Sequence, residues 1–442
     1  MTIAVLKTKA ETSLVQQFEA NAAKLPGGAT VLAARKAAFG AFVARGLPHR
    51  RIEEWKYTDL RGLLKDPISV AIHDDANVSL KDVDTALGPL ASLAADRIVF
   101  VNGSYRAELS PIAKAKGLDV TALSAGWSRL LDPAAVAASG SALDDDAVVA
   151  LNMAFVTDGA TIRIAPNTEL ARPLLVVQLS VGREGKLAST RNLITVGAGA
   201  AVTIIEVFAA IGSAPAHANA VTDLVTGDRA RVVHHKVSVT PSAAHLATSV
   251  VRLGAGTSYR AFQLTTASAV ARNQVFLTFA GEHAKIDVSG LMLGRGRDHI
   301  DTTLLIDHAV PHCESRELFR TVLDDNARAV FQGKVIVRPN AQKTDGKQMA
   351  NALMLSENAE FDSKPELEIY ADDVVCGHGA TCTELSADLL FYMRSRGIPI
   401  DQARAMLIES FAGEALDRVE DEAIRATFGE ITSAWLAAAP KS

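Results

Sequence analysis

Hydrophobic positions change their spacing twice along the chain, and the two changes divide it into three regions. Near the N-terminus, apolar residues such as Leu14 and Phe18 recur at helical spacing. From about Thr161 short runs of β-branched and apolar residues replace them, and after Thr383 the helical spacing returns. We therefore expect a mainly helical N-terminal domain (residues 1–160), a β core (161–385) and a C-terminal helical domain (386–442).

The β core contains a loose repeat. Its tight turns, rich in Gly, Asp and Asn, begin at Val196, Val225, Leu253 and Phe279, which are 29, 28 and 26 residues apart, and again at 323 and 355 after gaps of 44 and 32. A period in the high twenties is typical of the coils of a β-solenoid. The alternative is an antiparallel sandwich or barrel, whose turns recur roughly every 8–12 residues without a longer echo. The pattern favours the solenoid. The strand-like runs are residues 162–164, 174–179, 192–196, 202–207, 232–239, 259–265 and 274–279.

Three helices are expected after the β core. Ser386 is placed to cap the first, which Gly397 ends, and Asp401 to cap the second. The last has Ile424, Phe428, Ile431 and Trp435 on one stripe. This tail has two interpretations: it caps the end of the solenoid, or it offers an amphipathic face to a partner.

Composition is that of an ordinary globular protein and narrows the function classes. The 442 residues are 48% hydrophobic and 21% charged, with a formal net charge of −5, so bulk electrostatics do not favour nucleic acid as a partner. No run approaches the roughly 18 apolar residues of a membrane span, and the N-terminus does not resemble a signal peptide. Three cysteines do not form a disulfide framework, which favours the cytoplasm.

Common catalytic motifs are missing. Neither a P-loop nor a dinucleotide-binding fingerprint occurs. An acidic cluster, Glu366, Glu368, Asp372 and Asp373, suits a β-solenoid carbohydrate-active enzyme; the alternative interpretation is a solvated strand face. The segment 50–59, dense in charge and aromatic residues, is either a docking surface or a loop whose Trp55 packs on the core.

The most informative chemistry is a thiol and an imidazole two residues apart. Cys376 and His378 follow a strand-like run and would share one face of an extended chain, a pairing suited to a soft or borderline metal. With Cys382 they make three ligands, whereas structural zinc and most iron–sulfur sites need four. A shared or transient site therefore fits better than a stable metal centre. His312 and Cys313 form a second such pair, distant in sequence.

Several longer motifs, in order and at matching spacing, resemble the SufB/SufD family of iron–sulfur cluster assembly proteins, and most closely its SufD branch. They are Cys313-Glu-Ser315, Phe331-Gln-Gly-Lys-Val-Ile-Val337, Lys343-Thr-Asp-Gly-Lys-Gln348, Leu353-Met-Leu-Ser356, Lys364-Pro-Glu-Leu-Glu-Ile-Tyr-Ala-Asp-Asp-Val374, Cys376-Gly-His378-Gly-Ala-Thr381, Phe391-Tyr-Met-Arg-Ser-Arg-Gly397 and, upstream, Asn273-Gln-Val-Phe276, His299-Ile-Asp301 and Trp55-Lys-Tyr-Thr58. The resemblance implies a right-handed parallel β-helix between helical domains. It also implies a non-catalytic scaffold that docks a SufC-like ATPase, in a partnership with a SufB-like paralogue and two copies of that ATPase, which would explain the missing P-loop.

The resemblance also implies roles for particular residues. Cys376 and His378 match family positions at the interface with SufB, where a transient iron–sulfur cluster or iron would be held, with no cofactor bound stably by this chain alone. Phe391, Leu407 and Phe411 belong to the helices that match the ATPase-docking surface. Val375 stands where the family usually carries Lys, and Cys382 adds a thiol; a homodimer of the isolated chain and a part in iron acquisition are left open.

Overall fold

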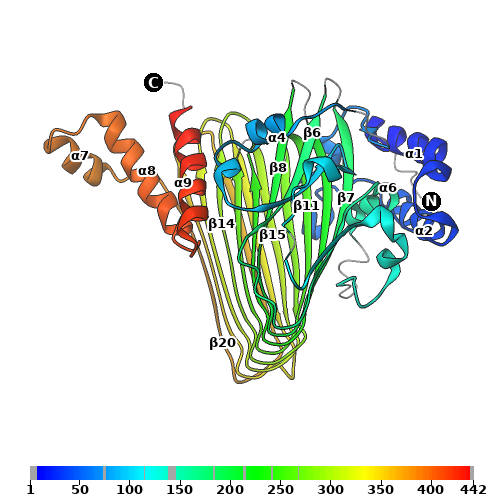
Figure 1. The fold of residues 1–442 in the computed structure, drawn as a ribbon. Coiled ribbons are helices and arrows are strands. Elements are labelled where there is room, and N and C mark those ends of the chain that lie inside the picture. Colours follow the sequence, from blue (N-terminus) through cyan, green and yellow to red (C-terminus); the bar gives the residue numbers. More distant parts are fainter. Residues whose placement is uncertain are drawn as a thin grey trace, which may run out of the picture.

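The computed structural model describes residues 7–72, 76–113, 115–137, 146–182, 185–212, 216–239, 242–266 and 268–438. Its centre is a parallel β-solenoid of about seven turns with helices at both ends of the chain, which confirms the expected fold class (Figure 1). Each coil contributes one strand to each of two ten-stranded sheets, because alternate strands of the chain pair in register with one another.

One sheet, here called the odd sheet, is formed by β5 (Ala160–Ile164), β7 (Lys186–Val196), β9 (Ala216–Thr226), β11 (Ser242–Leu253), β13 (Ala271–Phe279), β15 (His299–His308), β17 (Arg328–Val337) and β19 (Glu360–Ile369), with β1 (Ser69–Val70) and β4 (Leu118–Ala122). The even sheet is formed by β6 (Leu174–Val181), β8 (Ala201–Ile211), β10 (Arg231–Ser238), β12 (Ser258–Thr266), β14 (Lys285–Gly294), β16 (Glu314–Leu323), β18 (Asp345–Met354) and β20 (Val375–Thr383), with β2 (Asp96–Val101) and β3 (Ser104–Tyr105). Every strand run expected from the sequence lies in one of these strands, except that the run 232–239 extends one residue beyond the end of β10.

The expected turns are corners of the coils. Those at 196, 225, 253 and 279 follow strands of the odd sheet, whereas those at 323 and 355 follow strands of the even sheet. The 44-residue gap therefore separates a corner after the odd sheet from a corner after the even sheet. At seven of the eight corners from the odd to the even sheet, all except the one between β19 and β20, one residue has a left-handed backbone, which suits a sharp bend. These residues are Asn167, Gly199, Arg229, Gly256, His283, His312 and Lys343.

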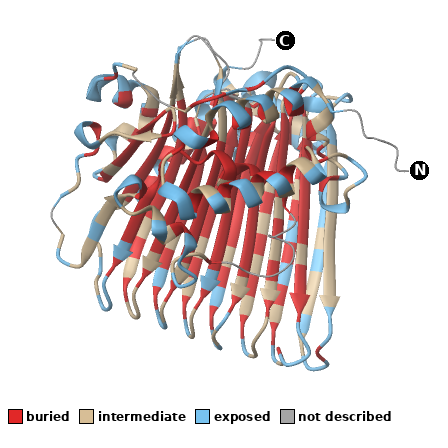
Figure 2. Ribbon diagram, turned by 90° about the vertical axis from the view of Figure 1, so that its right-hand side faces the viewer, coloured by how far each residue is buried: buried red, intermediate tan, exposed pale blue. Residues whose placement is uncertain are grey.

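The interior between the two sheets is the main hydrophobic core. Inward-facing residues such as Ile204, Val232 and Leu304 are at most 1% exposed, and many outward-facing residues are also covered by helices. Figure 2 shows the odd sheet from outside, behind the helices that cover it: residues along the strands are mostly buried, and exposed residues lie on the helices and at the lower corners. Burial on both faces explains why the strands form nearly continuous apolar runs.

Helices cover the outer faces of both sheets. On the odd sheet lie α1 (Lys9–Asn21), α2 (Gly28–Arg45) and α6 (Ala147–Phe155), and on the even sheet lie α4 (Leu80–Leu87), α8 (Ile400–Leu416) and α9 (Glu422–Ala437) (Figure 1). Shorter helical segments are α3 (Leu60–Leu63) and the 3-10 turns η1 (Ala22–Lys24), η2 (Glu53–Trp55), η3 (Gly88–Ser92), η4 (Ala107–Leu109), η5 (Leu123–Ala125) and η6 (Trp127–Leu131). Within the described ranges, no helix has the length and apolar character that crossing a bilayer demands.

The three C-terminal helices occur where the sequence predicts them. Ser386 caps α7 (Ala387–Ser395) by accepting a hydrogen bond from the backbone N–H of Leu389. Asp401, expected as the cap of α8, lies instead in its first turn, and Pro399 is the N-cap residue. Because α8 and α9 pack on the outer face of the even sheet, the tail does not cap the end of the solenoid. The helix α7 has no buried residue and extends away from the sheets (Figure 1).

Candidate functional site

The C-terminal end of the solenoid is an uncovered edge. The last strands, β19 and β20, each pair with one strand of their sheet, and no residue in either strand is buried. Three large apolar side chains are exposed there: Ile369 (42%), Tyr370 (59%) and Val375 (62%). The unpaired backbone groups of such an edge favour pairing with another chain.

Cys376 and His378 lie on this edge and share one face of β20. Their register partners on β18 are Gly346 and Gln348, so both side chains belong to the face that lines the solenoid interior. Cys376 is half-buried and packs against the interior core, whereas His378 is exposed. Cys382, farther along the same face, is also exposed.

The environment of Cys376 disfavours its thiolate. Burial, together with the nearby carboxyl groups of Asp345 and Glu317, raises the pKa of the Cys376 thiol, although a hydrogen bond from the backbone of Gly346 lowers it. Val375 supplies no cation that would act in the opposite direction. The thiol is therefore largely protonated at neutral pH.

The donor set at this edge is incomplete. Within the described ranges, no group of three His, Cys, Asp or Glu side chains is close enough to hold a metal ion. The second thiol and imidazole pair does not complete it: Cys313 is buried at the corner before β16, where its thiol lies 3.6 Å from the carbonyl oxygen of Gly281, and burial raises its pKa to about 11. Cys313 is therefore a structural thiol.

The acidic cluster on and after β19 is neutralised by lysines. The carboxylate of Glu366 lies 3.2 Å from Nζ of Lys364, and that of Glu368 lies 3.0 Å from Nζ of Lys334. Asp373 pairs with Lys343 in the same way. Glycoside hydrolysis requires two free carboxyl groups that face a common space. These three residues do not supply such a pair, because each is paired with a lysine.

The C-terminal helices present a second exposed apolar surface. On α7, Phe391 is 76% exposed, and its neighbours Tyr392 and Leu389 are 56% and 51% exposed. The other two expected docking residues lie differently: Leu407 and Phe411 are half-buried on α8, and the guanidinium of Arg320 lies 4.6 Å from the centre of the Phe411 ring. Of these three expected docking residues, only Phe391 has a mainly exposed side chain that a partner could cover.

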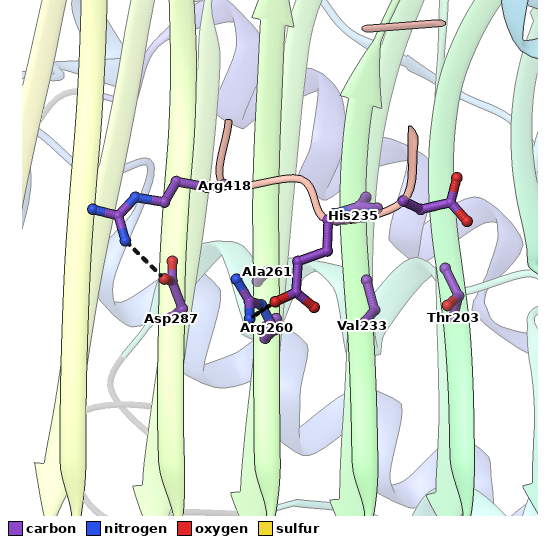
Figure 3. A pocket seen from close by; sticks show the side chains of 9 residues that line it. Thr203, Val233, His235, Arg260, Ala261, Asp287 and Arg418 are labelled. Carbon is purple, nitrogen blue, oxygen red and sulfur yellow. Dashed lines mark hydrogen bonds and ion pairs between the residues drawn. The ribbon is translucent and has the colours of Figure 1, made fainter. Parts of the chain in front are cut away.

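A cavity of about 280 Å³ lies between the even sheet and the connection from α8 to α9 (Figure 3). Two ion pairs join its walls, and each wall supplies the cation of one pair and the anion of the other. Arg260 of the sheet pairs with Glu420 of the connection, and Arg418 of the connection lies 3.3 Å from Asp287 of the sheet. His235 points into the cavity, where burial, reinforced by nearby positive charge, lowers its pKa to about 3. The ion pairs fasten the start of α9 to the solenoid.

The aromatic segment near residue 55 packs on the odd sheet. The guanidinium of Arg272 lies 3.7 Å from the centre of the Trp55 ring and pairs with Asp301, which also accepts a hydrogen bond from Thr58. His299 completes the cluster, with Nε2 2.9 Å from the Thr58 hydroxyl. Of the two interpretations of this segment, the structure therefore supports the packed loop.

Sequence reasoning missed a buried polar network inside the solenoid. The carboxylate of Glu206 lies 2.6 Å from Nε2 of His234 and accepts a hydrogen bond from Thr222 at 3.1 Å, and Nδ1 of His234 lies 3.0 Å from the hydroxyl of Tyr259. Burial opposes ionisation of Glu206, but Lys236 and these hydrogen bonds outweigh it and lower its pKa to about 2. The signal in the sequence was the charged run His-His-Lys within a strand, at positions 234–236.

Comparison with known proteins gives consistent matches along most of the chain. Residues 179–411 match the model of the SUF system FeS cluster assembly SufBD core domain, and residues 8–176 match that of the SufBD protein N-terminal region. An iron–sulfur cluster assembly SufBD family protein of Synechocystis is 33% identical over 389 residues, with 84% of each chain covered. The iron–sulfur cluster assembly protein SufD of Escherichia coli is 31% identical over 385 residues, covering 86% of this chain and 87% of that protein.

Proposed function

Because the chain belongs to the SufBD family of iron–sulfur cluster assembly proteins, we propose that it is a SufD-like scaffold subunit of a SUF assembly complex. In this proposal it pairs with a SufB-like paralogue through the open end of the solenoid and docks a SufC-like ATPase through its C-terminal helices. It has no catalytic activity of its own, and ATP hydrolysis belongs to the partner.

The observation that carries the proposal is the uncovered end formed by β19 and β20, with Cys376 and His378 on it. A paralogue with the same coil shape can continue both sheets by adding its own end strands, since backbone hydrogen bonds across a sheet edge give affinity without requiring a particular sequence. The exposed Ile369, Tyr370 and Val375 would be buried by such pairing.

The incomplete donor set suits iron or a nascent cluster as cargo held between two chains. His378 supplies an exposed imidazole, which binds iron in its neutral form, while Cys376 supplies a half-buried thiol with a raised pKa. The partner would supply the remaining ligands. Of the two residues, His378 is the more effective donor near neutral pH because the Cys376 thiol must first lose a proton.

The alternative of a carbohydrate-active enzyme has weaker support. Three of the four carboxylates on which it depends, Glu366, Glu368 and Asp373, are paired with lysines. An enzyme of that class needs one carboxyl group free to donate a proton and another free to act as a base or nucleophile.

The test is cluster content after co-expression of this chain with its paralogue and ATPase. His378→Ala should leave the yield of assembled complex near that of the wild type and strongly lower iron and acid-labile sulfide per complex. His283→Ala, an exposed histidine at a distant corner, is the matched control and should change neither quantity. A His378→Ala complex with the wild-type content of iron and sulfide would refute the proposed role of this edge.

A further inference from the structure

The turn between α2 and η2 exposes two arginines whose guanidinium groups have no partner among the described residues. A hydrogen bond of 2.9 Å from the backbone N–H of Ile52 to the carbonyl oxygen of His49 closes this turn, and Arg50 and Arg51 lie at its tip. Both side chains are exposed, and within the described ranges neither guanidinium forms a hydrogen bond or an ion pair. Trp55, farther along the same segment, packs on Arg272 of the odd sheet, so the exposed turn is anchored close to its tip.

The two arginines belong to the lining of an open cavity of about 390 Å³. This lining is polar and mostly positive, since it combines three arginines and a histidine with a single carboxylate. The lining residues are His49, Arg50, Arg51, Asp59, Arg61 and Gly62. Like charges around one space repel one another, so such an arrangement favours the binding of an anion that offsets the repulsion.

The carboxylate in the lining does not neutralise the arginines. Asp59 accepts a hydrogen bond of 3.0 Å from the backbone N–H of Gly62 and thereby caps α3. It forms no ion pair with any residue that the structure describes. The cavity therefore keeps an excess of positive charge.

Two donors of the cavity are held in place by other residues. The guanidinium of Arg61 lies 3.3 Å from the carboxylate of Glu11, which is buried and also accepts a hydrogen bond of 2.8 Å from the backbone N–H of Leu47. Nδ1 of His49 accepts a hydrogen bond of 3.2 Å from the backbone N–H of Arg51, so the neutral imidazole carries its proton on Nε2 and can donate a hydrogen bond from there. Donors that are already ordered lose little conformational freedom when an anion binds.

We propose that this cavity binds a diphosphate, either free or as the end of a small molecule, with His49 and Arg61 as fixed donors and Arg50 and Arg51 as the donors that close over it. The planar guanidinium group matches pairs of phosphate oxygens, which favours arginine at phosphate sites. The cavity is larger than a single phosphate group, so it has room for a second. The inference is independent of the proposed function, because the site uses neither β20 nor the C-terminal helices.

The lining also indicates what the site does not recognise. Among the described residues that form it there is no aliphatic side chain, and His49 is the one ring, so a base attached to the diphosphate would gain little contact. A protein surface fits poorly for the same reason, since the centres of protein interfaces are enriched in aromatic residues and depleted in charge. We therefore expect pyrophosphate and ADP to bind with similar affinity and inorganic phosphate to bind more weakly.

The experiment is calorimetric titration of the purified full chain with pyrophosphate, ADP and inorganic phosphate, at low ionic strength and without divalent cations. Pyrophosphate should bind at one site per chain. Arg50→Gln and Arg51→Gln should each raise its dissociation constant roughly tenfold, the factor expected from one hydrogen bond to a charged group. Their melting temperatures should equal that of the wild type, because neither side chain has a partner in the described chain.

The matched control is Arg297→Gln, which removes an exposed arginine from the corner between β14 and β15 and should bind pyrophosphate as the wild type does. Chemical labelling then locates the bound anion. Phenylglyoxal modifies accessible arginines, and mass spectrometry of the peptides measures the modification at each one. Pyrophosphate should protect Arg50 and Arg51 but not Arg297, and added sodium chloride should weaken this protection because salt screens exposed charges.

Three results would overturn the inference. A dissociation constant for pyrophosphate above about 1 mM, or an equal loss of affinity in Arg297→Gln and Arg50→Gln, would indicate an adventitious ion only. Binding without protection of Arg50 and Arg51 would place the anion elsewhere on the chain. ADP that binds about tenfold more tightly than pyrophosphate would show that the site recognises the nucleoside rather than the diphosphate alone.

Discussion

Phe391 offers the sharpest test of the proposed ATPase docking surface. It is 76% exposed on α7, a helix without buried residues, so no contact within the described chain explains an aromatic side chain at this position. A phenylalanine exposes about 200 Å² when free of contacts, so a partner that covers Phe391 would bury roughly 150 Å². At about 25 cal/mol per Å² this burial contributes roughly 3–4 kcal/mol.

Replacing Phe391 with alanine keeps the small part of that area due to Cβ, so the expected loss is about 2–3 kcal/mol. This corresponds to roughly a 30- to 150-fold increase in the dissociation constant for the ATPase. The melting temperature should not fall, because alanine favours helix formation and the Phe391 side chain is 76% exposed. The matched control is Leu80→Ala, because this side chain is 45% exposed on α4, a helix that covers the same sheet near its N-terminal coils.

Titration calorimetry of the purified ATPase into each variant measures the effect directly. Phe391→Ala should bind weakly and Leu80→Ala as tightly as the wild type. Equal dissociation constants for all three proteins would refute the docking role of α7. A loss of affinity accompanied by a lower melting temperature would show that Phe391 supports the fold.

Three further outcomes are expected. Cys376→Ala should lower iron and sulfide per co-expressed complex less than His378→Ala does, since the thiol is mostly protonated; the reverse order would show that the thiolate is the main ligand. Phe411→Asp should weaken ATPase binding in calorimetry and, because the ring packs on the solenoid, also lower the melting temperature by several degrees. Burial lowers the pKa of His308 to about 4 from 6.5, so its protonation favours the unfolded chain and stability falls as pH drops below 6.5. The loss in unfolding free energy between pH 7 and pH 5 should therefore be about 2 kcal/mol smaller in His308→Leu, measured by urea denaturation; equal losses would contradict it.

The β-solenoid was predictable because its physical requirements are local. Each coil turns at corners, where residues must tolerate a left-handed backbone, and its inward-facing positions must be apolar. Both requirements are therefore visible in the sequence. The interval between successive predicted turns is irregular between 279 and 323, because the first of these turns follows a strand of the odd sheet and the second a strand of the even sheet. Within one series the corners recur regularly, but the sequence alone does not say which sheet a strand joins.

Packing between residues far apart in the chain was less predictable from the sequence. The stacking of Trp55 on Arg272 joins residues more than two hundred positions apart, and neither local sequence requires the other. Similarly, the stripe on α9 shows that one face is buried but does not identify the surface that buries it.

The proposed partner interface on β20 and the proposed ATPase-docking helix α7 are close together along the chain. The strand β20, which carries Cys376 and His378, ends at Thr383, and α7 begins at Ala387, so three residues separate the edge strand from the exposed helix. The helix α8 is fastened to the even sheet by the pairing of Arg320 with Glu414, whereas α7 has no buried residue to hold it. The helix α7 is also joined to α8 by four residues and contacts it, so α7 connects the edge strand β20 with a helix that is fastened to the even sheet. A partner docked on α7 would therefore bind between the strand that carries Cys376 and His378 and the helix α8, which makes the two proposed surfaces neighbours along the chain.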